Sequence, residues 1–519
     1  MSWLDALLPP AAIVRILLLS LSCGVALALC LPRPGLCFLA WFSLAPLFVF
    51  WSESTAKKSF AVGWAAGFGF HGLALYWIYS TCRFAGIAAP IAVLAWAALA
   101  AFLAFNWGVI GALGCALARG LPRPWRPWVW AVVWTGLTVA AERWTPRLCL
   151  DILGYTQYKN LSLLQISALM GPYALGFLVV AFNAALAAAW KQVQGGEKSD
   201  WIARNLAIAA ALIIAIWGYG LYELERRMTA GTSARVEILQ PAIDQYQKWD
   251  PAFEQRILGN FLELLSRPRA ESPALIIWPE SSLPRWVREG EIIPEAADWS
   301  RKLGAFQVLG AVSKFQGRTY NSALLIGGDG RPRAAYHKRR LVPFGEFVLF
   351  SGFFRRFIGI LNELGGMAVG ERAQGLLRTP LGPAAASICY EAAFPRLARE
   401  DVKRGARWII NVTNDGWYKD TWGPYQHFYV NLFRAIENRV TVIRAGNSGI
   451  SAVIDPWGIV TAQLELNRRG RLDARVITED FFPARSFYAR HGDLFGLLNL
   501  GVLAALLLAA MTKKRLAWA

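Results

Sequence analysis

Residues 387–391 read Ser387-Ile388-Cys389-Tyr390-Glu391 and follow a run of small, apolar residues at 381–386. An apolar run that passes directly into a thiol, a phenol and a carboxylate is typical of a strand end, where a loop exposes a reactive side chain to substrate. Of the seven cysteines, Cys389 is the one surrounded by ionisable residues. The sequence predicts a nucleophile at Cys389, with a buried structural thiol as the alternative.

Two other segments end strand-like runs in a charged residue. Glu280 closes Trp278-Pro279-Glu280, and Lys338 lies within the basic stretch 336–340. Near the thiol, a carboxylate whose pKa is raised by burial can act as a general base, and an ammonium group can stabilise an oxyanion. The alternatives are a solvated strand end for Glu280 and a solvated or phosphate-facing patch for Lys338. Together the three segments indicate a catalyst that forms a thioester.

The composition places part of the chain in lipid. Of 519 residues, 55% are hydrophobic and 17% are charged, whereas ordinary soluble domains carry about 25% charged residues. The length allows two or three domains. Four scattered histidines and the lack of a C-x-x-C pair favour neither a metal site nor a cofactor.

The apolar residues gather into about eight spans, each near the length that crosses a bilayer. We place them at 11–31, 36–52, 60–80, 87–117, 127–142, 162–190, 203–223 and 494–510. The predicted domains are therefore a transmembrane domain at 1–224 with about seven helices, a large polar insert at 225–490, and a final helix with its tail at 491–519.

Basic residues in alternate short loops predict the orientation. They are Lys57, Lys58, Arg119, Arg123, Arg126, Lys191, Lys198, Arg204 and the tail 513–515. Such loops face the cytoplasm, which puts both termini inside and the insert outside. Orientation also accounts for much of the formal charge of +19, so we predict no nucleic-acid partner.

The insert has the pattern of an α/β layered domain. Short apolar runs without clean alternation predict strands that are buried on both faces, and helix-like segments lie between some of them. The predicted strands are 236–239, 274–277, 307–312, 323–326, 384–388, 408–412, 440–443 and 450–454, and the predicted helices are 251–266, 295–303 and 428–439.

The motifs in this insert resemble those of the nitrilase superfamily. More narrowly, the chain resembles the bacterial apolipoprotein N-acyltransferase family, in which a nitrilase-like domain is inserted among eight membrane helices. The resemblance rests on Trp278-Pro279-Glu280, on Tyr336-x-Lys338-x-x-Leu341-Val342-Pro343-Phe344-Gly345-Glu346, on Cys389-Tyr390-Glu391, and on the segments 240–250, 411–417, 423–427 and 444–450. It implies an αββα sandwich for the insert.

The resemblance also implies roles for individual residues. Cys389 would be the nucleophile, Glu280 the general base and Lys338 the stabiliser of the oxyanion. Supporting positions near these three are Glu346, Tyr390 and Glu391, and aromatic positions at the substrate entrance are Trp249 and Trp417. For both tryptophans, packing or an interfacial belt is the alternative.

The chain departs from the family pattern in three places. His337 stands where the family often has Asp, and Gly416 stands where it often has Ala. The segment 351–372, within the expected lid at 347–372, has no clear counterpart.

The activity that the resemblance implies is a two-step acyl transfer. A membrane phospholipid would donate its acyl chain to Cys389, and the α-amine of a diacylated apolipoprotein would accept it, on the periplasmic side of the bacterial inner membrane. One alternative is a membrane-tethered amidase or nitrile-type hydrolase that uses water as acceptor. Another is a scaffold or transporter without catalytic activity, which the complete Glu-Lys-Cys set disfavours.

Overall fold

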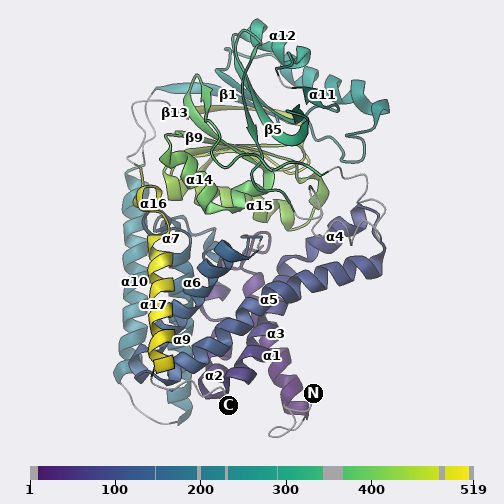
Figure 1. Cartoon of the computed structure of the whole chain (residues 1–519). Helices are drawn as coiled ribbons and strands as arrows, with labels where there is room; N and C mark the ends of the chain where they lie inside the picture. Colours follow the sequence, from purple (N-terminus) through teal and green to yellow (C-terminus); the bar gives the residue numbers. More distant parts are fainter. Residues whose placement is uncertain are drawn as a thin grey trace. The chain divides into compact units, whose positions relative to one another are not determined.

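The computed structural model describes residues 10–145, 148–195, 200–227, 232–288, 290–342, 346, 366–477 and 485–512. Most of the expected lid, 347–365, and the basic tail 513–515 lie outside these ranges. The chain divides into two compact units (Figure 1). The first unit is 1–226 with 421–429 and 491–519, and the second is 227–420 with 430–490.

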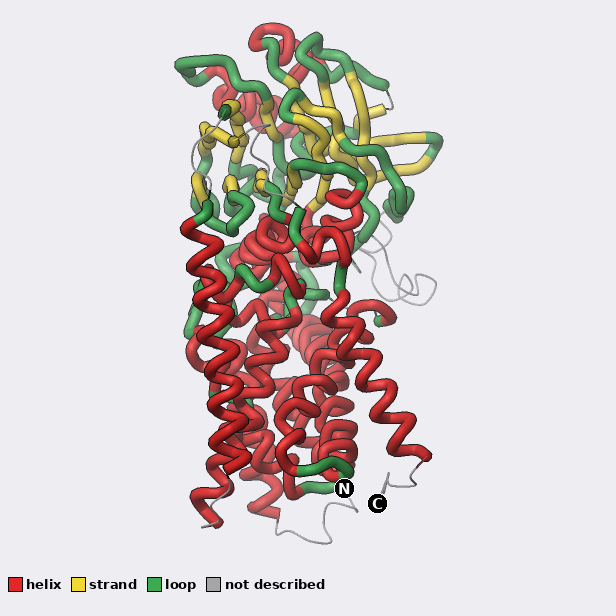
Figure 2. Tube along the Cα trace, turned by 90° about the vertical axis from the view of Figure 1, so that its left-hand side faces the viewer, coloured by secondary structure: helices red, strands yellow, loops and turns green. Residues whose placement is uncertain are grey.

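The first unit is built of helices, which Figure 2 shows in red. They are α1 (Pro10–Ala28), α2 (Ala45–Glu53), α3 (Ala56–Ala74), α4 (Tyr76–Phe84), α5 (Ala89–Arg119), α6 (Arg126–Trp144), α7 (Leu161–Leu164), α8 (Ser167–Met170), α9 (Tyr173–Gly195), α10 (Asp200–Glu225) and α17 (Leu494–Thr512).

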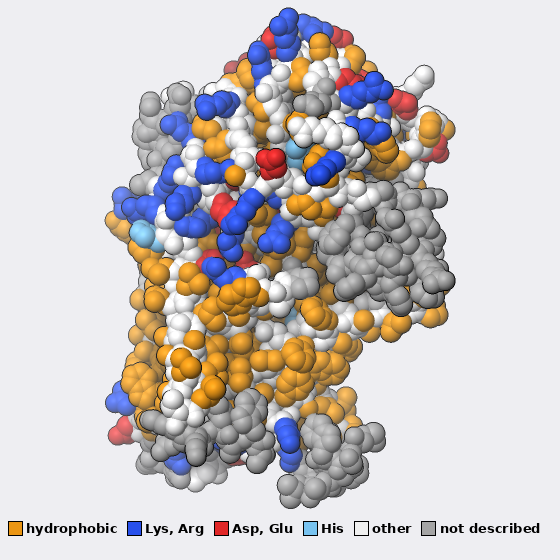
Figure 3. Space-filling view, viewed as in Figure 1, with side chains coloured by type: hydrophobic (Ala, Val, Ile, Leu, Met, Phe, Trp, Pro, Cys, Tyr) orange, Lys and Arg blue, Asp and Glu red, His pale blue; other side chains and the backbone are white. Residues whose placement is uncertain are grey.

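Five helices in the described part of the chain are long and apolar enough to cross a membrane. They are Ala11–Ala28, Ala89–Arg119, Tyr173–Gly195, Asp200–Glu225 and Leu494–Thr512. Their outer faces carry large exposed apolar side chains, such as Leu18, Leu94 and Leu508, and hydrophobic side chains cover much of this unit in Figure 3. Apolar surface of this extent is typical of protein that faces lipid.

Two of the predicted spans are not single continuous helices. Residues 36–52 fold as a short 3₁₀ helix, Cys37–Trp41, followed by α2, and residues 162–190 contain α7 and α8 before α9 begins. Helices α3 and α6 are each 19 residues long. Close packing explains the glycines of α3: a Cβ at Gly63 would lie 2.4 Å from the carbonyl oxygen of Trp107 in α5.

The second unit contains two sheets among its described residues. The first has the order β13-β1-β2-β4-β5-β6, with β3 paired to β4, and the second has the order β12-β11-β10-β9-β8-β7. The strands are β1 (Ser233–Gln240), β2 (Leu275–Ile277), β3 (Val287–Arg288), β4 (Phe306–Phe315), β5 (Arg318–Ile326), β6 (Pro332–His337), β7 (Leu377–Thr379), β8 (Gly382–Ile388), β9 (Trp408–Thr413), β10 (Thr441–Gly446), β11 (Ser451–Ile454), β12 (Val460–Leu464) and β13 (Gly470–Ile477).

The two sheets form the inner layers of a helix–sheet–sheet–helix sandwich. Strand β1 contacts β10, and β5 contacts β8, so the sheets pack against each other. Helices α11 (Glu254–Ser266) and α12 (Pro294–Leu303) contact strands of the first sheet, while α14 (Pro395–Lys403) contacts β8 of the second. This arrangement agrees with the αββα sandwich that the motifs imply.

The interior strands explain why the apolar runs of the sequence do not alternate. Every residue of β9 and of β10 is buried. Strand β9 is parallel to both of its neighbours, β8 and β10. Under the first sheet, the Phe261 ring of α11 stacks on Trp278 with centroids 4.5 Å apart. This packing fixes the end of β2, where one of the candidate catalytic residues follows.

Candidate active site

The three candidate catalytic residues each follow the carboxyl end of a strand. Glu280 comes three residues after β2, Lys338 comes directly after β6, and Cys389 comes directly after β8. Their side chains are buried, with exposed fractions of 7% for Glu280, 1% for Lys338 and 6% for Cys389. Charged groups are rarely buried unless they are paired, so the partners of these residues decide what the site can do.

Glu280, Lys338 and Glu346 form one buried cluster. Lys338 Nζ donates to Glu346 Oε1 at 2.8 Å and to Glu280 Oε1 at 3.4 Å. Asn321 of β5 joins the same two carboxylates, since its Nδ2 donates to Glu280 Oε1 at 2.6 Å and to Glu346 Oε1 at 2.7 Å. The amide and the ammonium group therefore hold two carboxylates side by side.

The two carboxylates keep Lys338 charged. Burial lowers the pKa of the amine, but the charges of Glu346 and Glu280 outweigh burial and raise that pKa well above its usual range. Lys338 therefore stays an ammonium ion at any physiological pH. A fixed cation in a dry site is suited to stabilising an oxyanion.

Cys389 is held as a protonated thiol. Burial raises its pKa well above the usual range, and the charge of Glu280 raises it further, while Lys338 lowers it. The residue adopts φ of 53°, a left-handed conformation that non-glycine residues rarely adopt and that is often found at functional sites. Because the thiolate is the nucleophilic form, this thiol needs a base, and the charge of Glu280 is one of those that act on it.

Glu391 connects the turn at Cys389 to the segment that carries Lys338. Its Oε2 accepts from the Ile388 N–H at 2.8 Å and from the Tyr336 hydroxyl at 2.9 Å. Its Oε1 accepts from the main-chain N–H groups of Arg339 at 2.6 Å and Arg340 at 3.1 Å. All four contacts are donors, which favours the ionised carboxylate, although burial raises its pKa. Glu391 thereby fixes the ends of β6 and β8 relative to each other.

The aromatic positions divide into buried and exposed ones. Tyr390 is buried, and its ring packs edge-on against Phe394 with centroids 4.9 Å apart. Trp249 and Trp417 are 42% and 39% exposed, which is compatible with places at the rim of a substrate entrance.

Two residues of the site were missed by sequence reasoning. Asn321 lies in the middle of β5, where a polar residue in an apolar strand is the signal that could have revealed it. Lys248 is 1% exposed, and its Nζ donates to the main-chain oxygen of Glu280 at 2.9 Å. It stands next to the exposed Trp249, and nothing in its sequence context indicates that it points inward.

The two substitutions relative to the family pattern have local explanations. The His337 ring stacks on Tyr320 with centroids 4.3 Å apart, and its Nδ1 lies 2.8 Å from the hydroxyl of Ser322. At Gly416, an added Cβ would approach Asn414 Oδ1 at 3.2 Å and Ser448 Oγ at 3.3 Å. Neither position contributes a group to the cluster around Lys338.

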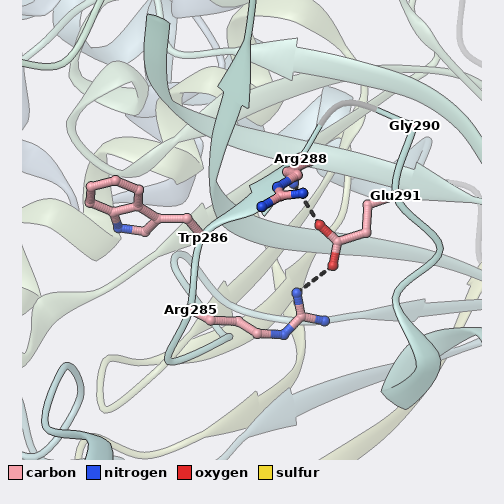
Figure 4. Close-up of a pocket in the computed structure, with 5 residues that line it drawn as sticks. All are labelled: Arg285, Trp286, Arg288, Gly290 and Glu291. Atoms are coloured by element: carbon pink, nitrogen blue, oxygen red, sulfur yellow. Dashed lines mark hydrogen bonds and ion pairs between the residues drawn. The ribbon is translucent and has the colours of Figure 1, made fainter. Parts of the chain in front are cut away.

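One pocket among the described residues is lined by none of the triad residues. It measures about 490 Å³ and is lined by Arg285, Trp286, Arg288, Gly290 and Glu291. Its polar groups satisfy one another, because Glu291 accepts from Arg285 Nη1 at 2.5 Å and from the Arg288 N–H at 2.7 Å (Figure 4). This pocket brings no nucleophile or base together.

Sequence comparisons place both units in known families. The profile described as "Carbon-nitrogen hydrolase" matches residues 238–481, and the profile described as "Apolipoprotein N-acyltransferase N-terminal domain" matches residues 23–185. The apolipoprotein N-acyltransferase of Geobacter metallireducens is 30% identical over 492 residues, which are 92% of each chain. The chain belongs to the apolipoprotein N-acyltransferase family.

Other members of the family are similar over most of the chain. The apolipoprotein N-acyltransferase of Agrobacterium fabrum is 34% identical over 88% of this chain and 89% of its own length, and that of Allorhizobium ampelinum is 32% identical over 96% of both. Among solved structures, Saccharomyces cerevisiae Nit3, a member of branch 10 of the nitrilase superfamily, has 18% identity and a TM-score of 0.37, covering 48% of this chain and 93% of that chain. Membership of the family, together with the apolar helices, identifies a membrane protein.

Proposed function

We propose that this chain transfers an acyl chain from a membrane phospholipid to the α-amine of the diacylglyceryl-cysteine of an apolipoprotein. The observation that carries the proposal is that Glu280 and Lys338 are buried together at strand ends and that their charges act on Cys389, in a chain that belongs to this family. Cys389 serves as nucleophile, Glu280 as general base and Lys338 as the cation for the oxyanion.

In the first step, Glu280 takes the proton of the Cys389 thiol, and Sγ attacks the ester carbonyl of the phospholipid. The carbonyl oxygen becomes an oxyanion, whose charge the ammonium group of Lys338 stabilises. When the tetrahedral species collapses, the ester C–O bond breaks, and the alkoxide takes the proton back from Glu280. The products are a thioester on Cys389 and a lysophospholipid.

In the second step, the neutral α-amine of the apolipoprotein attacks the thioester. Glu280 takes a proton from the attacking nitrogen, the C–S bond breaks, and the thiolate of Cys389 recovers that proton. The product is an amide on the lipoprotein. Water must be kept out of the site between the two steps, because hydrolysis would consume the thioester.

We extend the proposal to the placement of the protein in the membrane. About eight spans, formed by the apolar segments up to residue 224 and by 494–510, hold the chain in the bacterial inner membrane. The basic short loops support a cytoplasmic location for both termini, and hence a periplasmic location for the catalytic domain at 225–490. There the domain can meet both lipid-linked substrates at the outer leaflet, with Trp249 and Trp417 bordering their entrance.

The test uses the full-length protein in detergent with a phospholipid and a synthetic N-terminal diacylated lipopeptide. We expect mass spectrometry to find an acyl adduct on Cys389 and an N-acylated lipopeptide. Cys389→Ala should abolish both products. An acyl adduct that persists in the alanine variant, or release of free fatty acid only, would overturn the proposal; the second outcome would indicate a membrane-tethered hydrolase.

A further inference from the structure

Lys248 is a buried lysine that the mechanism above does not use. It lies in the turn after β1, where its two chain neighbours in the turn behave as surface residues: Trp249 is 42% exposed and Gln247 is partly exposed, whereas Lys248 is 1% exposed. Burying an ammonium group while leaving an adjacent indole in solvent reverses the usual preference of both side chains. Such an arrangement needs a compensating interaction inside the protein.

The segment that leads to Lys248 is anchored by two buried asparagines. Asn447 Oδ1 accepts from the Ile243 N–H at 3.1 Å, and its Nδ2 donates to the Ile243 oxygen at 2.9 Å. Two residues further along, Asn414 Nδ2 donates to Gln245 Oε1 at 2.6 Å. Beyond these two anchored residues, the Nζ of Lys248 reaches the main-chain oxygen of Glu280 at 2.9 Å.

The cluster around Lys338 contains more negative than positive charge when Lys248 is left out. Glu280 and Glu346 are two carboxylates that share Lys338 and the amide of Asn321. With Lys338 alone, the cluster would carry one excess negative charge. A second positive charge offsets that excess and favours the carboxylate form that a general base needs.

We propose that Lys248 is the counter-charge and positioning residue of Glu280, which keeps the general base ionised before each acyl-transfer step. It acts through Glu280 and does not touch the substrate. The proposal rests on the function proposed above, and it deepens that function by assigning the second cation of the site. With Lys248 included, two ammonium groups balance two carboxylates, and the cluster is neutral before the thiol gives up its proton.

The pKa of Lys248 depends on its burial and on the charged groups around it. Burial lowers the pKa of Lys248 to about 8, although the charges of Glu280 and Cys389 oppose this change. The other ionisable groups that act on Glu280 or on the thiol are Lys338, Glu346, Asp415 and Tyr418. Because the pKa of Lys338 is raised and that of Lys248 is lowered, Lys248 is the cation of this group that loses its charge as the pH rises through about 8.

The experiment measures single-turnover acylation of Cys389 between pH 5 and pH 10. Full-length protein in detergent receives phosphatidylethanolamine, and the release of lysophospholipid is followed for the unmodified protein, Lys248→Met and Lys248→Arg. Lys314→Met is the matched control, because Lys314 is an exposed lysine of the same unit whose Nζ lies over the Trp286 ring.

We expect Lys248→Met to move the midpoint of the ascending limb of the rate–pH profile upward by about one pH unit. Below the midpoints its rate should be about tenfold under that of the unmodified protein, and the two rates should converge at higher pH, where both proteins have passed their midpoints. Lys248→Arg should keep the midpoint of the unmodified protein, since it keeps the positive charge. The control should match the unmodified protein.

Other outcomes overturn the assignment. A Lys248→Met variant that is slower at every pH with an unchanged midpoint would show a structural role only. If Lys248→Met does not fold, Lys248→Gln, which also removes the charge but keeps a polar side chain, takes its place, and an unchanged midpoint in that variant overturns the proposal. Loss of acyl transfer in the unmodified protein would instead refute the proposed function, so the two failures are distinguishable.

Discussion

Replacing Asn321 by Asp would put a third carboxylate between Glu280 and Glu346. The Nδ2 group that now donates to both lies 2.6 Å from one carboxylate oxygen and 2.7 Å from the other. Two unit charges at such a separation repel each other by about 6 kcal/mol at an effective dielectric constant of about 20. That energy corresponds to a rise of about four pKa units. One of the three carboxyl groups would therefore keep a proton at neutral pH.

The expected result is the loss of the general base at pH 7. Because general bases contribute about 10²–10⁴-fold to rate, acylation of Cys389 in the Asp variant should fall by at least about 100-fold. Activity should return in part at high pH, since a carboxyl group with a raised pKa ionises only above that pKa. Single-turnover release of lysophospholipid measures both effects.

Asn321→Ala is the matched control, because it removes the same amide without adding charge. It should lose less activity than the Asp variant, and its pH profile should move less. An Asp variant with the rate and the pH profile of the unmodified protein would refute the reasoning, because it would mean that Asn321 does not join the two carboxylates.

Three further substitutions test the packing around the site and in the helical unit. Glu391→Gln turns a carboxylate oxygen into a donor that faces other donors, at a cost of about 1–3 kcal/mol for each unpaired buried group. Thermal unfolding in detergent should therefore begin several degrees lower. An unchanged unfolding temperature would argue against the four-donor arrangement. Gly310→Ala places a methyl group 2.6 Å from the Cα of Glu280, so acylation should slow by about 10–100-fold. A rate equal to that of the unmodified protein would mean that the position of Glu280 is not critical. Gln426→Leu removes two hydrogen bonds of the helical unit: Gln426 Oε1 accepts from the Trp77 indole N–H at 3.2 Å, and Nε2 donates to the main-chain oxygen of Ala74 at 2.9 Å. The protein should unfold at a lower temperature, while its acylation rate per folded molecule is retained.

The strands that sequence reasoning found and those that it missed differ in their place in the sheets. Interior strands such as β9 and β10 are continuous apolar runs, because both of their faces are covered. The missed strands β6, β7, β12 and β13 are the outermost strands of the two sheet orders, and β3 is a two-residue strand off the main path. Edge strands are less buried: β12 alternates between partly buried and exposed residues at every position. The apolar content of such a strand does not distinguish it from a loop.

The site shows the same limit at the level of single residues. The motifs around Glu280, Lys338 and Cys389 predict three residues that the fold places at strand ends. There the charges of Glu280 and Lys338 act on the thiol of Cys389. The supporting residues Asn321 and Lys248 could not be predicted, because their importance depends on which way each side chain points. A polar residue in a strand or a lysine in a turn is ordinary until its partners are known.

The neutral state of the Cys389 thiol bears on how long the protein survives between turnovers. Oxidants and disulfides attack exposed thiolates, and free cysteines outside the reducing cytosol are at risk of both reactions. A buried thiol with a raised pKa is a poor target. In the proposed mechanism, the burial that makes a general base necessary would also shield the thiol from oxidation, because Cys389 would become reactive only when the base takes its proton during acyl transfer.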